Sequence, residues 1–263
     1  FKSWIAEVER DAKRAGQVIT HEAPAAPTEE LQYETILDQA RFDVWLKKLK
    51  DAKLIAFDTE TTGLDAQQAQ LVGVSFAVKP GEAAYIPLTH SYMGVPDQLD
   101  RDTVLRALKP LLEDPNKAKV GQHAKFDINI LANCAIGGDQ ANGIVVQGVA
   151  FDTMLESYVL DSTATRHDMD SLALKYLGHT TTSFQDIAGK GVKQLTFDQI
   201  SLELAGPYAA EDADVTLRLH HVLHEKLQAI PSLNSVLTDI EMPLVPVLAR
   251  IERQGALVDA KLL

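Results

Sequence analysis

Five residues in three segments of the sequence have the types and spacing needed for metal-dependent chemistry. They are Asp58 and Glu60 in IAFDTETTGL, Asp127 in VGQHAKFDINIL, and Tyr208 and Asp212 in YAAEDADVTL. Carboxylate oxygens are the ligands that Mg²⁺ prefers, and a tyrosine hydroxyl can hydrogen-bond a water molecule while it stays neutral. Hydrolysis of a phosphodiester by two metal ions requires such carboxylates to meet at one place. The sequence therefore predicts a nuclease site.

The elements expected around these residues would position them in pairs. Leu54–Phe57 is an apolar run typical of a buried strand, and Asp58 continues it. Because residues two apart on a strand point to the same face, Asp58 and Glu60 should project side by side. Tyr208 and Asp212 are four residues apart in an Ala-rich helix, which places both on one helix face.

A pair of acidic residues is weak evidence when it stands alone. The chain has 37 acidic residues, and an Asp-x-Glu pair is most often part of a solvated turn. Asp58 differs because it directly follows an apolar strand, where a charge is costly unless it meets a cation. Asp127 also follows a strand-like stretch, residues 118–121, and opens a helix. Carboxylates at the ends of two strands and on a helix can meet in space.

The three segments, in this order and separation, resemble the three exonuclease motifs of the proofreading domain of bacterial family A DNA polymerases. The resemblance continues through LVGVSFAVKPGEAAYIPL, FDTMLESYVLDSTATRHDMDSLALKYLG, IAGKGVKQLTF and IEMPLVPVLARIERQGALVD, so it covers nearly all of residues 34–263. It implies an α/β protein with a ribonuclease-H-like exonuclease fold. The order of the expected strands and helices agrees with this fold, in which a mixed central sheet is flanked by helices.

The resemblance also implies a role for each of the five residues. Asp58 would bridge two divalent metal ions, Mg²⁺ or Mn²⁺. Glu60 and Asp212 would complete the shell of the first ion, and Asp127 would hold the second ion, directly or through water. Tyr208 would orient the attacking water. The implied activity is the removal of mispaired 3′-terminal nucleotides from DNA.

Further positions match residues that contact the substrate strand in the family. Leu64 and Phe184 match apolar positions that wedge against the terminal base. His123 departs from the family pattern, in which asparagine is usual; a histidine can still donate to a phosphate oxygen, but its charge would vary near neutral pH. The positions expected near the backbone of the bound strand are Gln122, His123, Lys125 and Arg166.

Charge and composition limit the partners that the chain could bind. A net charge of −12 argues against broad binding to duplex DNA, whose affinity comes mainly from neutralised phosphates. It is compatible with a small site that holds a few nucleotides of a single-stranded or frayed 3′ end. With one cysteine, no apolar run of membrane-spanning length and no amino-terminal signal pattern, a cytoplasmic protein is expected. The resemblance implies that it is bacterial, and a monomer is expected.

The sequence divides into four regions. Residues 1–13 resemble the end of a preceding 5′ nuclease domain, and residues 14–33, rich in Ala, Pro and Glu, indicate a flexible linker. The exonuclease domain is expected over 34–230, and residues 231–263 resemble the start of a polymerase domain. A chain that begins with Phe1 rather than Met is expected to be a fragment or a processed product, with the 5′ nuclease and polymerase domains as its partners in one longer chain.

Hydrophobic patterning gives the elements expected between residues 34 and 230. Strands are expected at 54–59, 71–78, 83–87, 118–121 and 149–152, and helices at 42–51, 101–113, 126–133, 153–160, 169–176, 197–204 and 208–229. His220 and His224 have the spacing of metal ligands on the last helix. Because no HExxH glutamate accompanies them, a solvated helix face is the favoured interpretation.

Two other functions remain open at this point. The chain could be a noncatalytic exonuclease-like domain that only supports a polymerase, since some members of the family have lost these acids. All four carboxylates and the tyrosine are present here, which favours an active enzyme. A ribonuclease could use the same site, but the polymerase-like carboxyl-terminal segment favours DNA.

Overall fold

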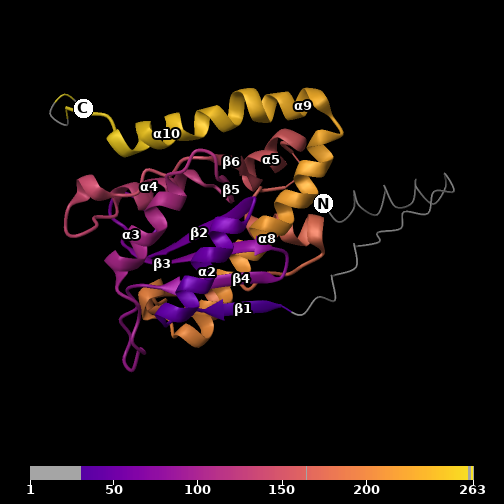
Figure 1. The fold of residues 1–263 in the computed structure, drawn as a ribbon. Coiled ribbons are helices and arrows are strands. Elements are labelled where there is room, and N and C mark those ends of the chain that lie inside the picture. The colour runs from indigo at the N-terminus through magenta and orange to yellow at the C-terminus, as the bar shows by residue number, and fades with distance from the viewer. Residues whose placement is uncertain (1–30, 164, 260–261, 263) are drawn as a thin grey trace.

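The computed structural model describes residues 31–163, 165–259 and 262. Within these residues, six strands form one mixed sheet in the order β1-β4-β3-β2-β5-β6 (Figure 1). The central strand β2 pairs antiparallel with β3 and parallel with β5. The strands are β1 (Gln32–Thr35), β2 (Leu54–Thr61), β3 (Leu71–Lys79), β4 (Glu82–Pro87), β5 (Ala118–Gly121) and β6 (Val149–Asp152).

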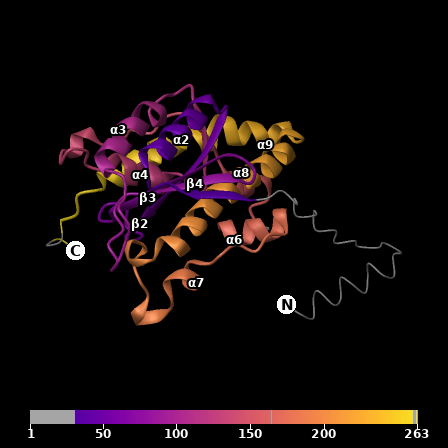
Figure 2. The ribbon, with the colours of Figure 1, turned by 60° about the horizontal axis from the view of Figure 1, so that its bottom comes forward.

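Helices cover both faces of the sheet, with α2, α3 and α4 on one side and α6, α7 and α8 on the other (Figure 2). The α-helices are α2 (Gln39–Asp51), α3 (Arg101–Leu112), α4 (Lys125–Asn133), α5 (Thr153–Leu160), α6 (Met169–Leu172), α7 (Phe184–Ala188), α8 (Leu202–Gln228), α9 (Pro231–Val236) and α10 (Met242–Gln254). Short 3₁₀ or π turns are η1 (Gln140–Asn142), η2 (Ala173–Leu177), η3 (Gly191–Lys193), η4 (Phe197–Gln199) and η5 (Leu237–Glu241). The mixed sheet flanked by helices confirms the expected fold class.

Burial on both faces explains why the central strands are apolar runs. Every residue of β4 is buried, as are the first seven residues of β3. These two strands form a hairpin whose turn contains Gly81 at φ 78°, a left-handed conformation that glycine adopts without steric cost. The sheet thus provides a rigid platform from which side chains of β2 can project at fixed spacing.

The long helix α8 differs from the two helices expected at 197–204 and 208–229. It begins at Leu202 and continues through Pro207, although a proline inside a helix removes a hydrogen bond. Packing accounts for this difference: Ala205 and Ala209 are fully buried, and a Cβ added to Gly206 would lie 2.0 Å from Thr35 Oγ1. Close contact with the sheet outweighs the local preference for a break.

The amino-terminal part of the sheet also differs from the expected organisation. The linker was expected to extend to Tyr33, but β1 begins at Gln32 and pairs in parallel with β4. A strand of four residues is too short to show a clear alternating pattern in the sequence. Pairing with the edge of β4 determines its conformation. The segment 1–13 and the linker residues 14–30 lie outside the described residues.

The last helices pack against the sheet domain. Met242, Val245 and Ala249 of α10 are buried in the same hydrophobic cluster as α3 and α4, and α9 and α10 run along one side of the molecule (Figure 1). No helix among the described residues is both long and apolar enough to cross a membrane.

Candidate active site

Three carboxylates meet where α8 crosses the sheet. Asp58 and Glu60 project from β2, and Asp212 projects from α8. Their ligand oxygens lie within 4.8 Å of one another. The strand spacing of two places Asp58 beside Glu60, and the packing of α8 on β2 brings Asp212, which lies 152 residues after Glu60 in sequence, to the same point. We call Asp58, Glu60 and Asp212 the acidic group.

Asp127 lies beside the acidic group but has partners of its own. It is in the first turn of α4 and is 2% exposed. Its Oδ1 accepts hydrogen bonds from the backbone N–H of Thr59, at 3.0 Å, and from the Thr59 hydroxyl, at 2.5 Å. Thr59 therefore fixes the rotamer of Asp127 next to β2. The motif did not identify Thr59 as a site residue. Because side chains alternate along a strand, its position between Asp58 and Glu60 does indicate that it points to the opposite face of the sheet from these two acids.

The acidic residues are poorly solvated and repel one another. Desolvation raises the pKa of Asp58 to about 7. Desolvation also raises the pKa of Glu60, Asp127 and Asp212 well above its usual range, and Asp58 adds to the increase for all three. Glu60 Oε1 is buried and has no hydrogen-bond partner. A hard divalent cation bound to these desolvated oxygens would offset the cost of their charged forms.

Tyr208 precedes Asp212 by one turn of α8 and adjoins the acidic group. Desolvation raises the pKa of its hydroxyl, and Asp212, Glu60 and Asp58 raise it further. The hydroxyl is therefore neutral at physiological pH, and it donates a hydrogen bond to Asp212. While the hydroxyl donates this hydrogen bond to Asp212, its oxygen can still accept a hydrogen bond from water.

Phe184, one of the two expected wedge residues, lies close to Tyr208. The two ring centroids are 6.4 Å apart, and Phe184 also stacks on Phe197 at 6.4 Å with an interplanar angle of 15°. Leu64, the other wedge residue, is in the loop after β2 and is 95% exposed. An apolar side chain this exposed is free to contact a ligand.

Glu211, which the sequence did not single out, holds the segment that leads to α7. Its Oε1 lies 2.8 Å from His179 Nε2, and its Oε2 accepts a hydrogen bond of 2.9 Å from the backbone N–H of Thr182. Glu211 directly precedes Asp212 on α8. Its contacts with His179 and Thr182 therefore tie the segment before Phe184 to the helix that carries Tyr208 and Asp212.

Gln122 and His123 follow β5 and differ in their environment. Gln122 Nε2 donates to the backbone oxygen of His167 at 2.9 Å, and the hydroxyl of Thr153 donates to Gln122 Oε1. His123 is exposed and has φ 59°, while its N–H donates to Asp152 at 3.2 Å. Asn, Asp and His are the non-glycine residues enriched in this left-handed region, so the backbone accepts histidine where the family usually has asparagine.

Lys125 and Arg166 also have acidic neighbours. Lys125 Nζ forms an ion pair with Glu252 of α10. Arg166 is largely exposed, and its Nε lies 3.5 Å from Asp168 Oδ2, which caps α6. Of the expected backbone contacts, His123 and Arg166 are thus exposed, while Gln122 and Lys125 are engaged within the protein.

Comparison with known proteins identifies the family. Residues 33–228 match a protein family described as 3′–5′ exonuclease. The chain belongs to this 3′–5′ exonuclease family. Over 263 residues this exonuclease sequence is 73% identical to DNA polymerase I of Pseudomonas aeruginosa, a match that covers 100% of the chain and 28% of that protein. The chain thus spans little more than a quarter of this relative, and the resemblance to bacterial family A DNA polymerases is confirmed.

Solved structures share the exonuclease fold. The structure of M. smegmatis Pol1 in complex with DNA primer-template and dNTP has a TM-score of 0.63 at 22% identity, over 86% of this chain and 33% of that one. Brucella melitensis NrnC with bound Mg²⁺ has a TM-score of 0.60 at 21% identity, over 88% of this chain and 98% of that one. These likenesses confirm the ribonuclease-H-like exonuclease fold.

The raised pKa of Asp58 predicts how pH changes the stability of the metal-free exonuclease. The folded state holds a proton on this carboxyl up to a pKa of about 7, whereas the usual pKa is 3.8. The folded state therefore binds more protons between these values, so stability falls as pH rises from about 4 to about 7. In EDTA, the melting temperature should decrease more steeply from pH 5 to pH 8 for the wild type than for Asp58→Asn. Parallel curves for the two proteins would contradict the assignment.

Proposed function

We propose that this chain is a divalent-metal-dependent exonuclease domain that hydrolyses the terminal phosphodiester at a single-stranded or frayed 3′ end of DNA. The observation that carries the proposal is the convergence of Asp58, Glu60 and Asp212, with Asp127 beside them and Tyr208 one turn from Asp212. The membership of the 3′–5′ exonuclease family supports the direction of cleavage.

The residues of the site fit Mg²⁺. All donors are carboxylate oxygens, desolvation makes their charged forms costly without a cation, and Glu60 Oε1 is buried without a partner. In our proposal Asp58 would bridge two ions, Glu60 and Asp212 would hold the first, and Asp127 the second. The chemistry that such ions supply when bound is activation of the attacking water and neutralisation of charge on the leaving oxygen. NrnC, which shares the fold, contains bound Mg²⁺.

The remaining chemistry belongs to side chains of the chain. Tyr208 donates to Asp212 and presents its oxygen to the attacking water, and a hydroxyl with a raised pKa stays neutral while it does so. Thr59 holds Asp127 in place through two hydrogen bonds, which keeps that carboxylate aligned with β2. The site is therefore organised before the substrate binds, and this lowers the cost of reaching the transition state.

The proposed substrate contacts follow from exposure and position. Leu64 and Phe184 would wedge against the terminal base, and His123 and Arg166 would contact the backbone of the strand. Gln122 would act indirectly, through its bond to His167, and Lys125 would be released from Glu252 when it meets a phosphate.

We also propose that the chain works within a longer DNA polymerase I, in the bacterial cytoplasm and as a monomer. The exonuclease domain would occupy residues 34–230, and residues 231–263 would begin the polymerase domain, after a 5′ nuclease domain and a linker. The apolar side chains that α10 exposes support a further domain against this helix: Leu244, Val247, Leu248 and Ile251.

One assay tests the proposed activity. A single-stranded DNA oligonucleotide with a 3′ label should release labelled mononucleotide when Mg²⁺ is present and not when EDTA replaces it. Folded protein that releases no label with Mg²⁺ or Mn²⁺ would favour the noncatalytic support domain. Faster digestion of an RNA oligonucleotide of the same sequence would favour a ribonuclease.

The wedge assignment predicts a ranking of substrates. A base must be unpaired to be wedged, so the rate should decrease from single strand to mismatched duplex to matched duplex. Phe184→Ala should weaken binding of the terminal nucleotide by about 1–3 kcal/mol if the ring stacks on a base. Equal rates on matched and frayed ends would exclude the wedge.

Leu64 provides the matched variant for this test. Because Leu64 is 95% exposed, Leu64→Ala should leave the melting temperature unchanged while it lowers the preference for frayed ends. Phe184 packs against Phe197 and Tyr208, so the melting temperature of Phe184→Ala must be measured alongside its binding.

A further inference from the structure

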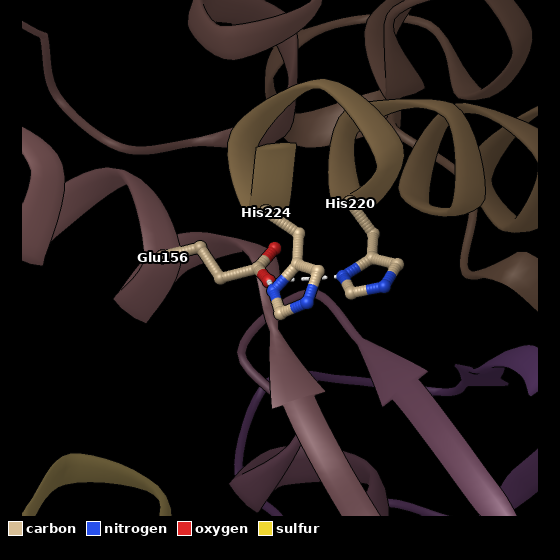
Figure 3. A group of neighbouring side chains, drawn as sticks. All are labelled: Glu156, His220 and His224. Carbon is tan, nitrogen blue, oxygen red and sulfur yellow. Dashed lines mark hydrogen bonds and ion pairs between the residues drawn. The ribbon is translucent and has the colours of Figure 1, made fainter. Parts of the chain in front are cut away.

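A second cluster of ligand-type side chains lies on α8, separate from the acidic group. Glu156 from α5 points toward His220 and His224 from α8 (Figure 3). Potential ligand atoms of all three lie within 4.8 Å of one another. His220 is only 4% exposed, so the expectation that this helix face is solvated is wrong. Histidine counts as polar in a sequence pattern, but here α5 and β6 cover it.

We propose that Glu156, His220 and His224 form a binding site for a Zn²⁺-type ion. Two imidazole nitrogens and one carboxylate oxygen are a donor set that suits zinc, whereas Mg²⁺ prefers oxygen donors alone. Glu156 Oε1 lies 2.9 Å from His220 Nδ1 and 3.6 Å from His224 Nδ1. Ligands about 2.0–2.1 Å from a tetrahedral zinc are about 3.3–3.4 Å apart, and the two distances lie on either side of this value.

Two atoms of this cluster are buried and have no hydrogen-bond partner. Glu156 is fully buried, and its Oε2 has no hydrogen-bond partner; His224 Nδ1 has none either. Leaving such polar atoms unpaired away from water is costly. A hydrogen bond between Glu156 and His220 leaves His224 Nδ1 unpaired, whereas a cation held between the three side chains would use its lone pair as well.

The surroundings suit a metal site as well. His224 Nε2 lies 2.9 Å from Gln228 Nε2. If His224 Nδ1 binds the ion, Nε2 carries the proton, and the carboxamide oxygen of Gln228 can accept it after a flip of the amide. The ring of Phe151 lies 4.3 Å from His220 and 4.8 Å from His224, between centroids, and shields the cluster. The His224 side chain is 22% exposed, which leaves access for a water as fourth ligand.

The ion would fasten α5 to the helix of the acidic group. Asp212 and His220 are eight residues apart on α8, a rise of about 12 Å, so the two sites are distinct. They also differ in their donors, because the acidic group offers oxygens alone. A zinc at the second site would restrain α8 without taking part in hydrolysis.

Calorimetric titration with Zn²⁺ tests this site in a background where the acidic group is impaired. The chain with Asp58→Ala, freed of metal by a chelator, should bind one equivalent of Zn²⁺, and this binding should raise its melting temperature in the presence of excess Mg²⁺. Adding His224→Gln should weaken Zn²⁺ binding by on the order of 100-fold and remove the rise in melting temperature.

His221→Gln is the matched control. His221 neighbours His220 on the same helix but is exposed and outside the cluster, so its substitution should leave Zn²⁺ binding unchanged. The melting temperature of each metal-free variant separates loss of the ligand from loss of the fold. Absence of Zn²⁺ binding in the Asp58→Ala chain, or equal binding by its His224→Gln and His221→Gln derivatives, would overturn the proposal and leave a buried Glu–His pair.

Discussion

Asp58→Ala should reduce Mg²⁺-dependent hydrolysis of a 3′-labelled oligonucleotide by on the order of a thousandfold or more. In the proposed arrangement Asp58 is the acid that would touch both ions, so its loss removes charge compensation on the attacking and leaving oxygens together. It also lies at the centre of the electrostatics, since it raises the pKa of Glu60, Asp127 and Asp212. Single-turnover kinetics with saturating Mg²⁺ would measure the effect.

The same substitution should not weaken the metal-free fold. Removing one carboxylate from a cluster of like charges relieves repulsion, so the melting temperature in EDTA at pH 8 should be equal to that of the wild type or higher. Asp97→Ala, which removes an exposed acid before α3, should change neither rate nor stability. Near-native turnover by Asp58→Ala would refute the two-metal assignment.

The acidic group could be predicted from sequence because its spacing follows local rules. A strand places Asp58 and Glu60 on one face, and a helix turn brings Tyr208 beside Asp212. Both rules hold because Asp58 and Glu60 precede the register shift in β2 at Glu60/Thr61, and Tyr208 and Asp212 lie on one continuous helix. The packing of α8 across β2 is not a local property, and only the resemblance to a family predicts it.

Contacts between distant segments could not be predicted in this way. Thr59 and Asp127 are 68 positions apart, and Glu156 and His220 are 64 apart. Their meeting depends on the parallel pairing of β2 with β5 and on the packing of α5 against α8, which no periodicity encodes. Hence the support of Asp127 was missed, and His220 was taken for a solvated residue.

The start of α8 also differs from the expected helices because of tertiary packing. Patterning predicts one helix at 197–204 and another at 208–229, but α8 continues from Leu202 through Pro207, where Gly206 packs closely against Thr35. Propensity is a weak prior where tertiary contacts are this close. Because Tyr208 and Asp212 lie just beyond this proline, the uninterrupted helix matters for the site: it holds both residues on one rigid element.

Tyr208→Phe should slow hydrolysis while it leaves metal binding almost unchanged. The hydroxyl is proposed to position water, and in its neutral form it donates a hydrogen bond to Asp212. Loss of a group that positions a nucleophile typically costs about 10²–10⁴-fold in rate. The ring is retained, so its contacts with Phe184 and Phe197 and the fold should persist.

Asp212→Ala, one helical turn later, provides the contrast that decides the roles. Its carboxylate is a member of the acidic group, so both metal affinity and rate should fall. Calorimetric titration with Mn²⁺ beside a single-turnover assay distinguishes the two variants, because a water-positioning residue changes rate alone and a ligand changes both. If Tyr208→Phe lost metal together with rate, or kept the full rate, the water-positioning role would be wrong. Its raised hydroxyl pKa would then be no more than the consequence of burial, with a smaller contribution from the neighbouring carboxylates.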